Sequence, residues 1–558
     1  MAEPKLRKEK VMEFSFFYRE EMISEAKQTH YDLLVIGGGI TGTGIALDAA
    51  LRGHKVLLVE KNDFAYGTSS RSTKLIHGGL RYLKQLEFAL VKEVGSERAI
   101  VHKLAPHLVI PEKMLLPLRE KRGYGSLLTS FGLKLYDWLA GVTGKDRRLM
   151  LTRRQTLRRE PLLKKDDVKG GALYAEYRTD DARLTIEVAK KAFAHGALVL
   201  NYCNVERFEY ENGKVAGAVI RDVLNDKSFA VKSKVTVNAA GPWVDTLRKE
   251  DGSLQGKRLH LTKGVHIVVP RDRLPIRQAI YFDVAEDSRM IFAIPRGEKT
   301  YIGTTDTNYN ADIDGVQTSR QDAEYLVRGV NESFPGAELK LQDIESSWAG
   351  LRPLIHEDGK SASELSRKDE IFESESGLIS MAGGKLTGYR KMAERVVNLV
   401  EKKYLPPFKV RGSLTVGARL GDGAFINYKS VRKYLLALKK KFRRIGLDES
   451  QAHYLVNTYG KQSDLIMERF NEMDEPVLEL RLLLAELWFA VHYEMVGSAQ
   501  DFLIRRTGRL YFDIHSVRTF GKEVVNELAN YLKWSEEKRD SELVALEEAI
   551  HRCVGFKQ

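Results

Sequence analysis

The sequence predicts an α/β fold built on a buried parallel sheet, interrupted by an inserted antiparallel sheet and followed by an all-helical C-terminal domain. Three observations support this prediction. A glycine-rich strand–helix–strand unit occupies residues 31–60, short and evenly spaced strands lie within 258–345, and 3.6-residue apolar periodicity dominates beyond Pro406-Pro407. At 558 residues, the chain is long enough for about two to four domains.

The first unit reads as an apolar strand, a glycine-rich turn, a helix and a second apolar strand. Gly37 permits a tight turn, Gly39 lets the backbone approach a pyrophosphate, and Gly42 lets the helix pack against the strand. The N–H groups at the helix start can bind an anion. Glu60 ends the second strand, where a carboxylate accepts hydrogen bonds from an adenosine ribose. The unit therefore predicts a dinucleotide site rather than an ordinary glycine turn.

The residues beyond Glu60 indicate which dinucleotide is bound. A nicotinamide-binding domain usually continues straight into another strand and helix. Here the chain instead gives a run of hydroxyl side chains, a lysine and paired glycines over residues 67–82. Such a loop suits the pyrophosphate, the ribityl chain and the ring of a flavin, so the sequence favours a flavin dinucleotide.

Six motifs, in this order, resemble the FAD-dependent glycerol-3-phosphate dehydrogenases of the respiratory, quinone-linked type, in a Gram-positive-like form. They are GGGITG from residue 37, GTSSRSTKLIHGGLRYL from 67, NAAGPWVD from 238, SSWAGLRPL from 346, SRKDE from 366 and AGGKLTGYRKMAE from 382. The similarity runs from about residue 31 to the C-terminal region. It implies an FAD-binding two-dinucleotide fold of the glutathione-reductase and D-amino-acid-oxidase type, with an inserted substrate domain and a helical C-terminal domain.

The dinucleotide motif and the resemblance together define the expected cofactor site. FAD is the expected cofactor, and the sequence shows no metal-ligand spacing. The residues expected to contact FAD are Gly37, Gly39, Gly42, Glu60, Lys61, Thr68, Ser69, Ser70, Lys74, His77, Gly78, Gly79, Leu80, Gly241, Trp243, Gly383, Gly384, Lys385, Leu386 and Thr387.

The chain divides into five predicted regions. They are an amphipathic leader over 1–30, a discontinuous FAD-binding domain over 31–110, 160–257 and 346–403, a basic amphipathic interfacial segment over 111–159, an antiparallel-sheet substrate domain over 258–345, and a helical C-terminal domain over 408–558.

Composition narrows the class of protein. Apolar residues make up 43% of the chain and charged residues 30%, which is typical of a folded protein with an ample core. The two cysteines, Cys203 and Cys553, cannot form a disulfide framework and fit a reducing compartment. No run of about 18 apolar residues is present, and the first thirty residues lack the apolar core of a signal peptide. A cytoplasmic location is therefore expected.

The net charge of +13 is the compositional oddity. It fits a solvated surface, an anionic substrate, a nucleic acid or an anionic membrane face. Residues 118–159 interleave Lys and Arg with aromatic and apolar side chains, which is typical of an interfacial helix but equally of a core-facing helix with solvated lysines. The leader, with Phe14 among its aromatics, is a weaker candidate of the same kind. The resemblance favours a peripheral enzyme on the inner face of the cell membrane.

Elements further along the chain repeat the α/β pattern. A helix is predicted from Asp180, a hairpin at Asn212-Gly213, and a buried strand at 235–237 that brings the chain back against the cofactor. The inserted strands are predicted at 265–269, 279–282, 290–294 and 301–303, and the C-terminal helices at 430–445, 451–459, 477–494 and 522–534. The first of these helices is strongly basic, for which we favour a solvated or partner-facing surface over membrane contact.

A second glycine pair is expected to face the flavin. Residues 378–387 read as a strand that ends at Gly383-Gly384, followed by a helix over 389–400. A helix start placed beside a flavin directs its positive end at the side of the ring that carries negative charge once the ring is reduced.

Oxidation of a secondary alcohol by a flavin needs a base for the hydroxyl proton and cations for a substrate phosphate. The resemblance places Arg352, Arg367, Tyr82 and Lys385 against the substrate, with Arg352 and Arg367 anchoring the phosphate through their planar forks. Arg367 could instead form a surface ion pair. Lys385 could polarise the substrate oxygen or the flavin.

His266 is the expected base, and the expected catalytic residues are His266, Arg352 and Lys385. His266 lies mid-strand among apolar neighbours, a position where a histidine is more often a satisfied core residue. Its place in the family motif Lys263-Gly264-Val265-His266 favours the catalytic role. His77 is a rival for which we expect contact with the cofactor.

The predicted function is oxidation of sn-glycerol 3-phosphate to dihydroxyacetone phosphate by hydride transfer from C2 to FAD, with electrons passed to a membrane quinone. A soluble oxidase that makes H2O2 is the alternative. Such oxidases carry an insertion after the equivalent of Arg352-Pro353-Leu354, and here only residues 355–365 precede Ser366-Arg367. A basic nucleic-acid-binding module is supported by charge alone, without a recognised motif, so no nucleic-acid partner is expected. A homodimer is possible on this reading.

Overall fold

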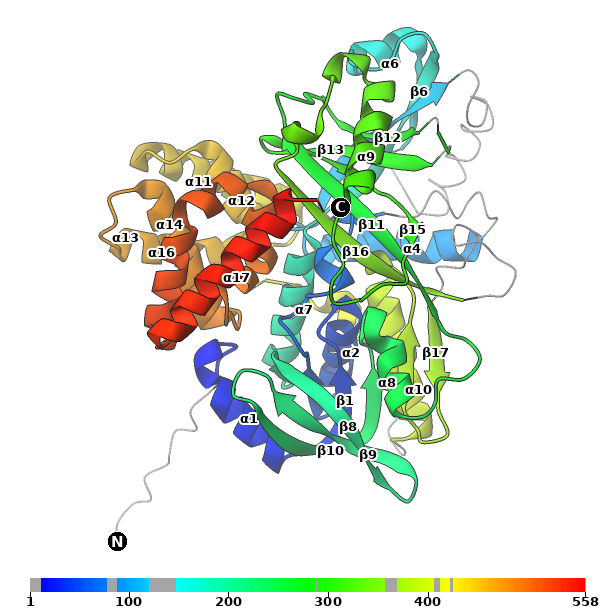
Figure 1. The fold of residues 1–558 in the computed structure, drawn as a ribbon, viewed down its shortest axis with the longest axis vertical. Helices are drawn as coiled ribbons and strands as arrows, with labels where there is room; N and C mark the ends of the chain where they lie inside the picture. Colours follow the sequence, from blue (N-terminus) through cyan, green and yellow to red (C-terminus); the bar gives the residue numbers. More distant parts are fainter. Residues whose placement is uncertain are drawn as a thin grey trace.

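The computed structural model describes residues 12–77, 88–119, 147–284, 286–287, 289–356, 369–405, 412–421 and 425–556. A parallel sheet forms the lower half of the molecule, a larger second sheet forms the upper half, and the C-terminal helices pack to one side (Figure 1). The predicted site residues Gly78, Gly79, Leu80, Tyr82 and Arg367 lie outside the described residues, as does most of the predicted interfacial segment.

The parallel sheet begins with the predicted glycine-rich unit. Its main strands follow the order β18 (Ile379–Ala382), β10 (Lys227–Asn238), β1 (His30–Ile36), β2 (Val56–Val59) and β7 (Leu198–Leu200), with β17 (Glu370–Glu373) antiparallel at the edge and a β8 (Cys203–Glu211) and β9 (Lys214–Asp222) hairpin. The helices α2 (Ile40–Leu51), α7 (Asp181–Ala194), α8 (Val244–Glu250) and α10 (Tyr389–Lys403) accompany it (Figure 1). β2, β7 and the end of β1 read as continuous apolar runs, as expected for strands of a parallel sheet whose faces are both covered by helices. The dinucleotide-binding α/β prediction is confirmed.

The second sheet contains the predicted inserted strands β11 (Leu259–Pro270), β12 (Ala279–Asp283), β13 (Met290–Arg296) and β14 (Lys299–Gly303). The short strand β15 (Thr307–Asn308) also lies within the predicted 258–345 domain. Five strands from outside that domain join the same sheet: β3 (Leu75–Ile76), β4 (Ile110–Arg119), β5 (Leu149–Thr152), β6 (Val168–Arg178) and β16 (Ser346–Ile355). The predicted boundaries at 110, 159, 257 and 346 therefore do not coincide with the limits of this sheet. The helices α4 (Phe88–Leu104), α6 (Arg153–Arg159) and α9 (Arg320–Ser333) complete this part of the chain.

The beginning of the predicted interfacial segment belongs to this second sheet. β4 pairs with β6 along its whole length, and its residues Met114 and Leu115 are fully buried. Residues 111–119 are therefore core strand rather than membrane-facing helix, which corrects the prediction for this part. Residues 147–159 form β5 and the short helix α6, and α6 begins at a Thr152 capping box.

The described part of the leader packs onto the body. Its helix α1 (Arg19–Gln28) buries Met22 and Ile23, and Arg19 binds Asp222 at 2.7 Å. Phe14 stacks on Phe64 with ring centroids 5.7 Å apart and is buried. Phe14 is therefore a core residue, which corrects its place among the aromatics expected at a membrane.

The C-terminal domain is helical, as predicted. Its helices are α11 (Tyr428–Ile445), α12 (Glu449–Tyr459), α13 (Ser463–Glu472), α14 (Leu478–Tyr493), a π-helix at Asp501–Arg506, α15 (Arg509–Phe512), α16 (Ile514–Leu532) and α17 (Glu536–Val554). α11 buries one apolar stripe and exposes the opposite, basic face to solvent, together with Leu436. Within the described ranges, no helix is both long enough and apolar enough to cross a membrane.

Candidate active site

A cavity of about 500 Å³ lies where the two sheets meet. Both predicted glycine segments line it, although they are separated by more than three hundred residues in the chain. The predicted site residues that line the cavity are Gly37, Gly39, Glu60, Lys61, Thr68, Ser69, His77, Gly241, Trp243, His266, Arg352, Gly383, Gly384, Lys385, Leu386 and Thr387. The cofactor end and the substrate end predicted from the sequence therefore share one cavity.

The cavity wall around Gly37 can accept only glycine. Gly37 has φ +114°, and a Cβ there would lie 2.6 Å from the Ala239 carbonyl oxygen. Gly42 does not line the cavity. It lies where α2 packs against the glycine turn, and a Cβ there would lie 1.9 Å from the Gly37 carbonyl oxygen. These close approaches bring the N-terminus of α2 to the cavity wall, where the positive end of the helix dipole favours an anion.

Glu60 is fixed by backbone donors at the same end. The Gly38 N–H donates to one carboxylate oxygen at 2.7 Å, and the Asn62 N–H donates to the other at 2.9 Å. Ser69 accepts from the Ile40 N–H at 3.0 Å and so ties the hydroxyl-rich loop to the start of α2. A carboxylate held in this way has lone pairs left for ribose hydroxyls. The glycines, the helix end and Glu60 together fit the adenosine and pyrophosphate of FAD.

Lys74 and Ser70, both expected at the cofactor, lie behind the cavity wall. The Lys74 ammonium binds the Asp181 carboxylate at 2.5 Å and the Ser70 carbonyl at 3.1 Å, and its side chain is buried. Asp181 also accepts from the Ser72 N–H at 2.9 Å. Lys74 therefore anchors the loop to α7, and that anchor presents the loop's other residues to the cavity.

His266 lies on β11, in the second sheet, and lines the cavity. Its Nε2 is 3.0 Å from Thr73 Oγ1, and its ring stacks on Trp348 at 4.8 Å with an interplanar angle of 11°. Its Nδ1 is buried and has no hydrogen-bond partner among the residues that the structure describes. Burial is the main cause that lowers the pKa of His266 well below its ordinary value, and the nearby positive charges of Arg352 and Lys74 lower it further. The imidazole is therefore neutral at neutral pH.

The His266 ring occupies the space that a side chain at position 303 would fill, and Gly303 has none. Gly303 pairs with His266 across β14 and β11, and a Cβ on Gly303 would lie 2.2 Å from His266 Cδ2. We expect Gly303→Ala to displace the imidazole and to slow flavin reduction by about tenfold or more, because small misplacements of a reacting group are costly. Stopped-flow reduction measures this rate. Gly336→Ala is the control, since a Cβ there meets nothing within 4 Å; equal rates in the two variants would contradict the positioning role.

Arg352, on β16, is held by three acceptors. Its Nη1 donates to Asp306 at 2.9 Å and to the Thr305 carbonyl at 3.1 Å, and its Nη2 donates to Thr304 Oγ1 at 2.7 Å. The guanidinium lines the cavity with its side chain about one-fifth exposed (21%). A fixed, accessible guanidinium of this kind suits a phosphate or a carboxylate.

The second glycine segment forms the remaining wall. Gly383 and Gly384 have φ +76° and +82°, which glycine adopts without strain. Thr387 Oγ1 lies 3.2 Å from both the N–H and the carbonyl of His77, so this wall joins the hydroxyl-rich loop directly. Lys385 lines the cavity just before α10 begins at Tyr389.

Sequence reasoning missed several lining residues. Thr304 and Asp306 follow the end of β14, where a Gly-Thr-Thr-Asp run after a strand signals a turn but no function. Thr73 belongs to the hydroxyl-rich motif, but the sequence does not distinguish it from the other hydroxyl residues there. An apolar group was also missed, and its members come from three strands of the second sheet: Leu75, Tyr281, Met290 and Phe292.

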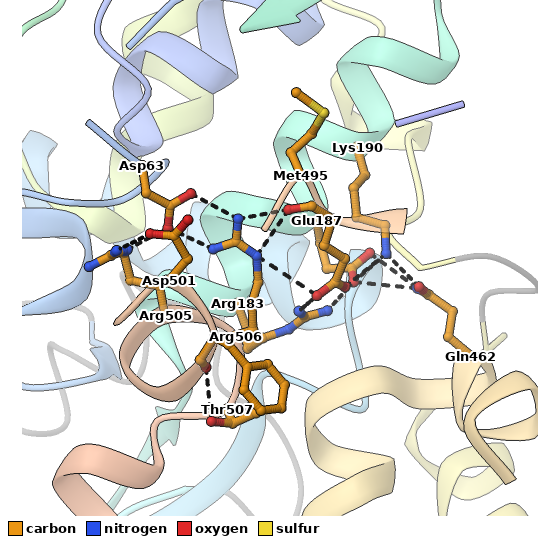
Figure 2. Close-up of polar contacts among 12 residues, drawn as sticks. Asp63, Arg183, Glu187, Lys190, Gln462, Met495, Asp501, Arg505, Arg506 and Thr507 are labelled. Carbon is orange, nitrogen blue, oxygen red and sulfur yellow. Dashed lines mark hydrogen bonds and ion pairs between the residues drawn. The ribbon is translucent and has the colours of Figure 1, made fainter. Parts of the chain in front are cut away.

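Buried ion pairs join the C-terminal domain to the turn that follows Glu60 (Figure 2). Arg506 binds the Asp63 carboxylate in a bidentate pair at 2.8 and 2.9 Å, and Arg505 binds the same carboxylate. Asp63 belongs to the turn that follows Glu60, and this turn closes on the glycine loop through the Ala65 N–H to Gly38 carbonyl bond at 3.0 Å. Burial alone would raise the pKa of Asp63, but Arg506 and Arg505 hold it below its usual value.

A second branch of the network fixes α7. Arg183 binds Glu187 at 2.6 Å (Figure 2). Arg183 also binds Glu494 at 2.6 Å, and Lys190 binds Glu494 at 3.1 Å. The same helix carries Asp181, which anchors the Lys74 loop. Residues of the C-terminal domain therefore hold both the turn beyond Glu60 and the helix behind the hydroxyl-rich loop.

Removing one partner of such a buried pair leaves an unpaired charge. We expect Arg506→Gln to lower the free energy of unfolding by roughly 3 kcal/mol, at the low end for buried pairs because Arg505 still binds Asp63. Arg207→Gln breaks an exposed pair and should cost at most about 1 kcal/mol. Chemical denaturation of the two full-length variants measures the difference, and equal unfolding midpoints would contradict the account.

Comparison with known proteins supports FAD as the cofactor of this cavity. Residues 32–390 match the model of the FAD dependent oxidoreductase family, and residues 417–539 match the C-terminal domain of alpha-glycerophosphate oxidase. The chain is 47% identical to aerobic glycerol-3-phosphate dehydrogenase of Bacillus subtilis and 45% identical to that of Staphylococcus aureus, covering 97% of this chain and 98% of each relative.

Solved structures give the same result. The glycerol-3-phosphate dehydrogenase of Bacillus halodurans, complexed with FAD, superposes with a TM-score of 0.83 at 44% identity, covering 98% of this chain and 100% of that one. The FAD-binding prediction is confirmed by this likeness and by the family match. The chain therefore belongs to the FAD-dependent oxidoreductases and, within them, to the family of aerobic glycerol-3-phosphate dehydrogenases.

Proposed function

We propose that this chain oxidises sn-glycerol 3-phosphate to dihydroxyacetone phosphate and that its electrons pass to a membrane quinone. The observation that carries the proposal is the shared cavity, in which a dinucleotide cradle at one end meets a guanidinium and a neutral imidazole at the other. The near-full-length likeness to aerobic glycerol-3-phosphate dehydrogenases supports the same substrate.

In this proposal, Arg352, which lines the cavity, binds the substrate phosphate through N–H groups of its guanidinium, and Arg367 remains a proposed second anchor. Thr304 and Asp306 restrict the guanidinium to one orientation, so little side-chain entropy is lost when the anion binds. Lys385 adds a positive charge to the same cavity, where it can stabilise a developing alkoxide.

His266 takes the hydroxyl proton at Nε2, the ring nitrogen beside Thr73. This role requires the neutral ring to carry its hydrogen at Nδ1, so that Thr73 donates to Nε2 in the resting state. Stacking on Trp348 fixes the plane of the ring, and the missing side chain at Gly303 leaves room for it. When bound, FAD supplies the redox chemistry by accepting a hydride from C2 of the alcohol.

We further propose that the protein acts on the cytoplasmic face of the membrane as a peripheral enzyme. The net charge of +13 supports attraction to anionic lipids. A homodimer is a further proposal.

Anaerobic titration tests the proposed reaction. Glycerol 3-phosphate should bleach the oxidised-flavin absorption of the purified protein, and glycerol at the same concentration should not. Reoxidation by a soluble quinone should be faster than reoxidation by O2. Absorption unchanged by glycerol 3-phosphate would contradict the substrate assignment, and rapid H2O2 formation would instead assign an oxidase.

A further inference from the structure

One row of residues crosses five strands of the second sheet on the cavity side. Directly paired neighbours link Trp348, His266, Gly303, Phe292 and Tyr281 in that order. Paired residues on adjacent strands point to the same face of a sheet. His266, Phe292 and Tyr281 all line the cavity, so this face of the row is a cavity wall.

The row carries two separate stacked pairs. Trp348 and His266 form the first pair, and the Tyr281 and Phe292 rings form the second, with centroids 4.3 Å apart and an interplanar angle of 19°. Gly303 separates the pairs and contributes no side chain of its own. Phe292 and Tyr281 are both half-buried, so part of each ring remains accessible.

The two halves of the row have different surroundings. The His266 half faces the guanidinium of Arg352, the Thr304 hydroxyl and the Asp306 carboxylate. The Tyr281–Phe292 half lies with Met290 and Leu75, and the neighbouring Arg289, which pairs with Asp287 at 3.4 Å, also lines the cavity. A three-carbon phosphorylated alcohol needs cations and hydrogen-bond partners, which the first half supplies. Nothing in such a substrate calls for stacked rings and a thioether.

The reaction does need a second substrate of apolar character. Oxidation of the alcohol releases two electrons and two protons, and a quinone that takes up two electrons and two protons becomes a quinol. A planar aromatic ring stacks well on aromatic side chains, and methionine adapts to its outline. The Arg289 guanidinium, which lines the same cavity, can donate to a quinone carbonyl oxygen.

We propose that the Tyr281–Phe292 pair, with Met290, is the docking wall for the electron-accepting quinone. This inference rests on the proposed function, because it assigns the acceptor of that reaction to a part of the same cavity. The alcohol and the quinone then use adjoining walls at different stages of one catalytic cycle.

Phe292→Leu tests this wall, with Phe292→Tyr as the matched control that keeps the ring. Reduction by glycerol 3-phosphate and reoxidation by 2-methyl-1,4-naphthoquinone are measured separately by stopped flow, and ferricyanide serves as a small acceptor that needs no apolar wall. We expect Phe292→Leu to slow quinone reoxidation by about tenfold and to change the reduction rate and the ferricyanide rate much less, with the flavin spectrum unshifted. Phe292→Tyr should behave like the unmodified protein.

The possible outcomes separate this inference from the proposed function. If the quinone fails to reoxidise the unmodified protein, both the quinone part of the proposed function and the docking-wall inference are wrong. If it reoxidises that protein and Phe292→Leu equally fast, only the docking wall is wrong. A shifted flavin spectrum or lower FAD content in Phe292→Leu would assign the wall to the cofactor and overturn the inference.

Discussion

His266→Ala should reduce the rate of flavin reduction by glycerol 3-phosphate by about 10²–10⁴-fold, the usual contribution of a general base. FAD should stay bound, because the Gly38 and Asn62 contacts that fix Glu60 do not involve His266. The loss should appear in the reductive half-reaction, measured anaerobically by stopped flow.

His260→Ala is the matched control for this prediction. His260 lies on the same strand, β11, and its Nε2 is 3.0 Å from Asn308 Oδ1 at an exposed position. We expect this variant to retain a near-normal rate. A near-normal rate in His266→Ala would remove the imidazole from the chemistry and leave it as a packing residue beneath Trp348.

The pH dependence follows from the lowered pKa of His266. A base must be unprotonated, and burial with the charges of Arg352 and Lys74 keeps this ring neutral below the ordinary histidine pKa of 6.5. The rate of flavin reduction should therefore stay level as the pH falls from neutral to that value, and should drop only at lower pH. A decline centred on the ordinary histidine pKa would contradict the neutral, buried base.

Arg352→Ala should lower kcat/KM for glycerol 3-phosphate by about 10²–10³-fold, or roughly 3–4 kcal/mol, because two charge-assisted hydrogen bonds to the phosphate are lost. Discrimination between glycerol 3-phosphate and glycerol should fall by the same factor. Arg352→Lys should recover only part of the loss, since an ammonium cannot form the bidentate contact.

Arg328→Ala controls for the change in net charge. Arg328 forms an exposed pair with Glu286 and does not line the cavity. Its kcat/KM should match that of the unmodified protein. Unchanged discrimination in Arg352→Ala would mean that the phosphate binds elsewhere.

Much of the cofactor end could be predicted because its requirements are local. Gly37 and Gly42 are needed where a Cβ would strike the backbone, and Glu60 is set by the length of one strand–helix–strand unit. Such steric demands leave a readable pattern in a short stretch of sequence. The helices of the C-terminal domain were predictable for a similar reason, since 3.6-residue periodicity is also local.

Contacts between distant segments could not be predicted in this way. β4 reads as part of a basic stretch, and only its pairing with β6 shows that it is a core strand. Lys74 resembles a cofactor ligand in the sequence, but Asp181, more than a hundred residues away, takes up its charge. The same limit applies to Arg505 and Arg506, whose partner Asp63 comes from the opposite end of the chain.

The central claim is that the dinucleotide cradle and the substrate cations open into one cavity around a single flavin. A crystal structure of the FAD-loaded protein with dihydroxyacetone phosphate tests it most directly. The account predicts electron density for the adenosine at Glu60 and for the phosphate within hydrogen-bond distance of the Arg352 guanidinium, with His266 on the same side of the cavity. A phosphate bound away from Arg352, or an adenosine bound away from Glu60, would contradict it.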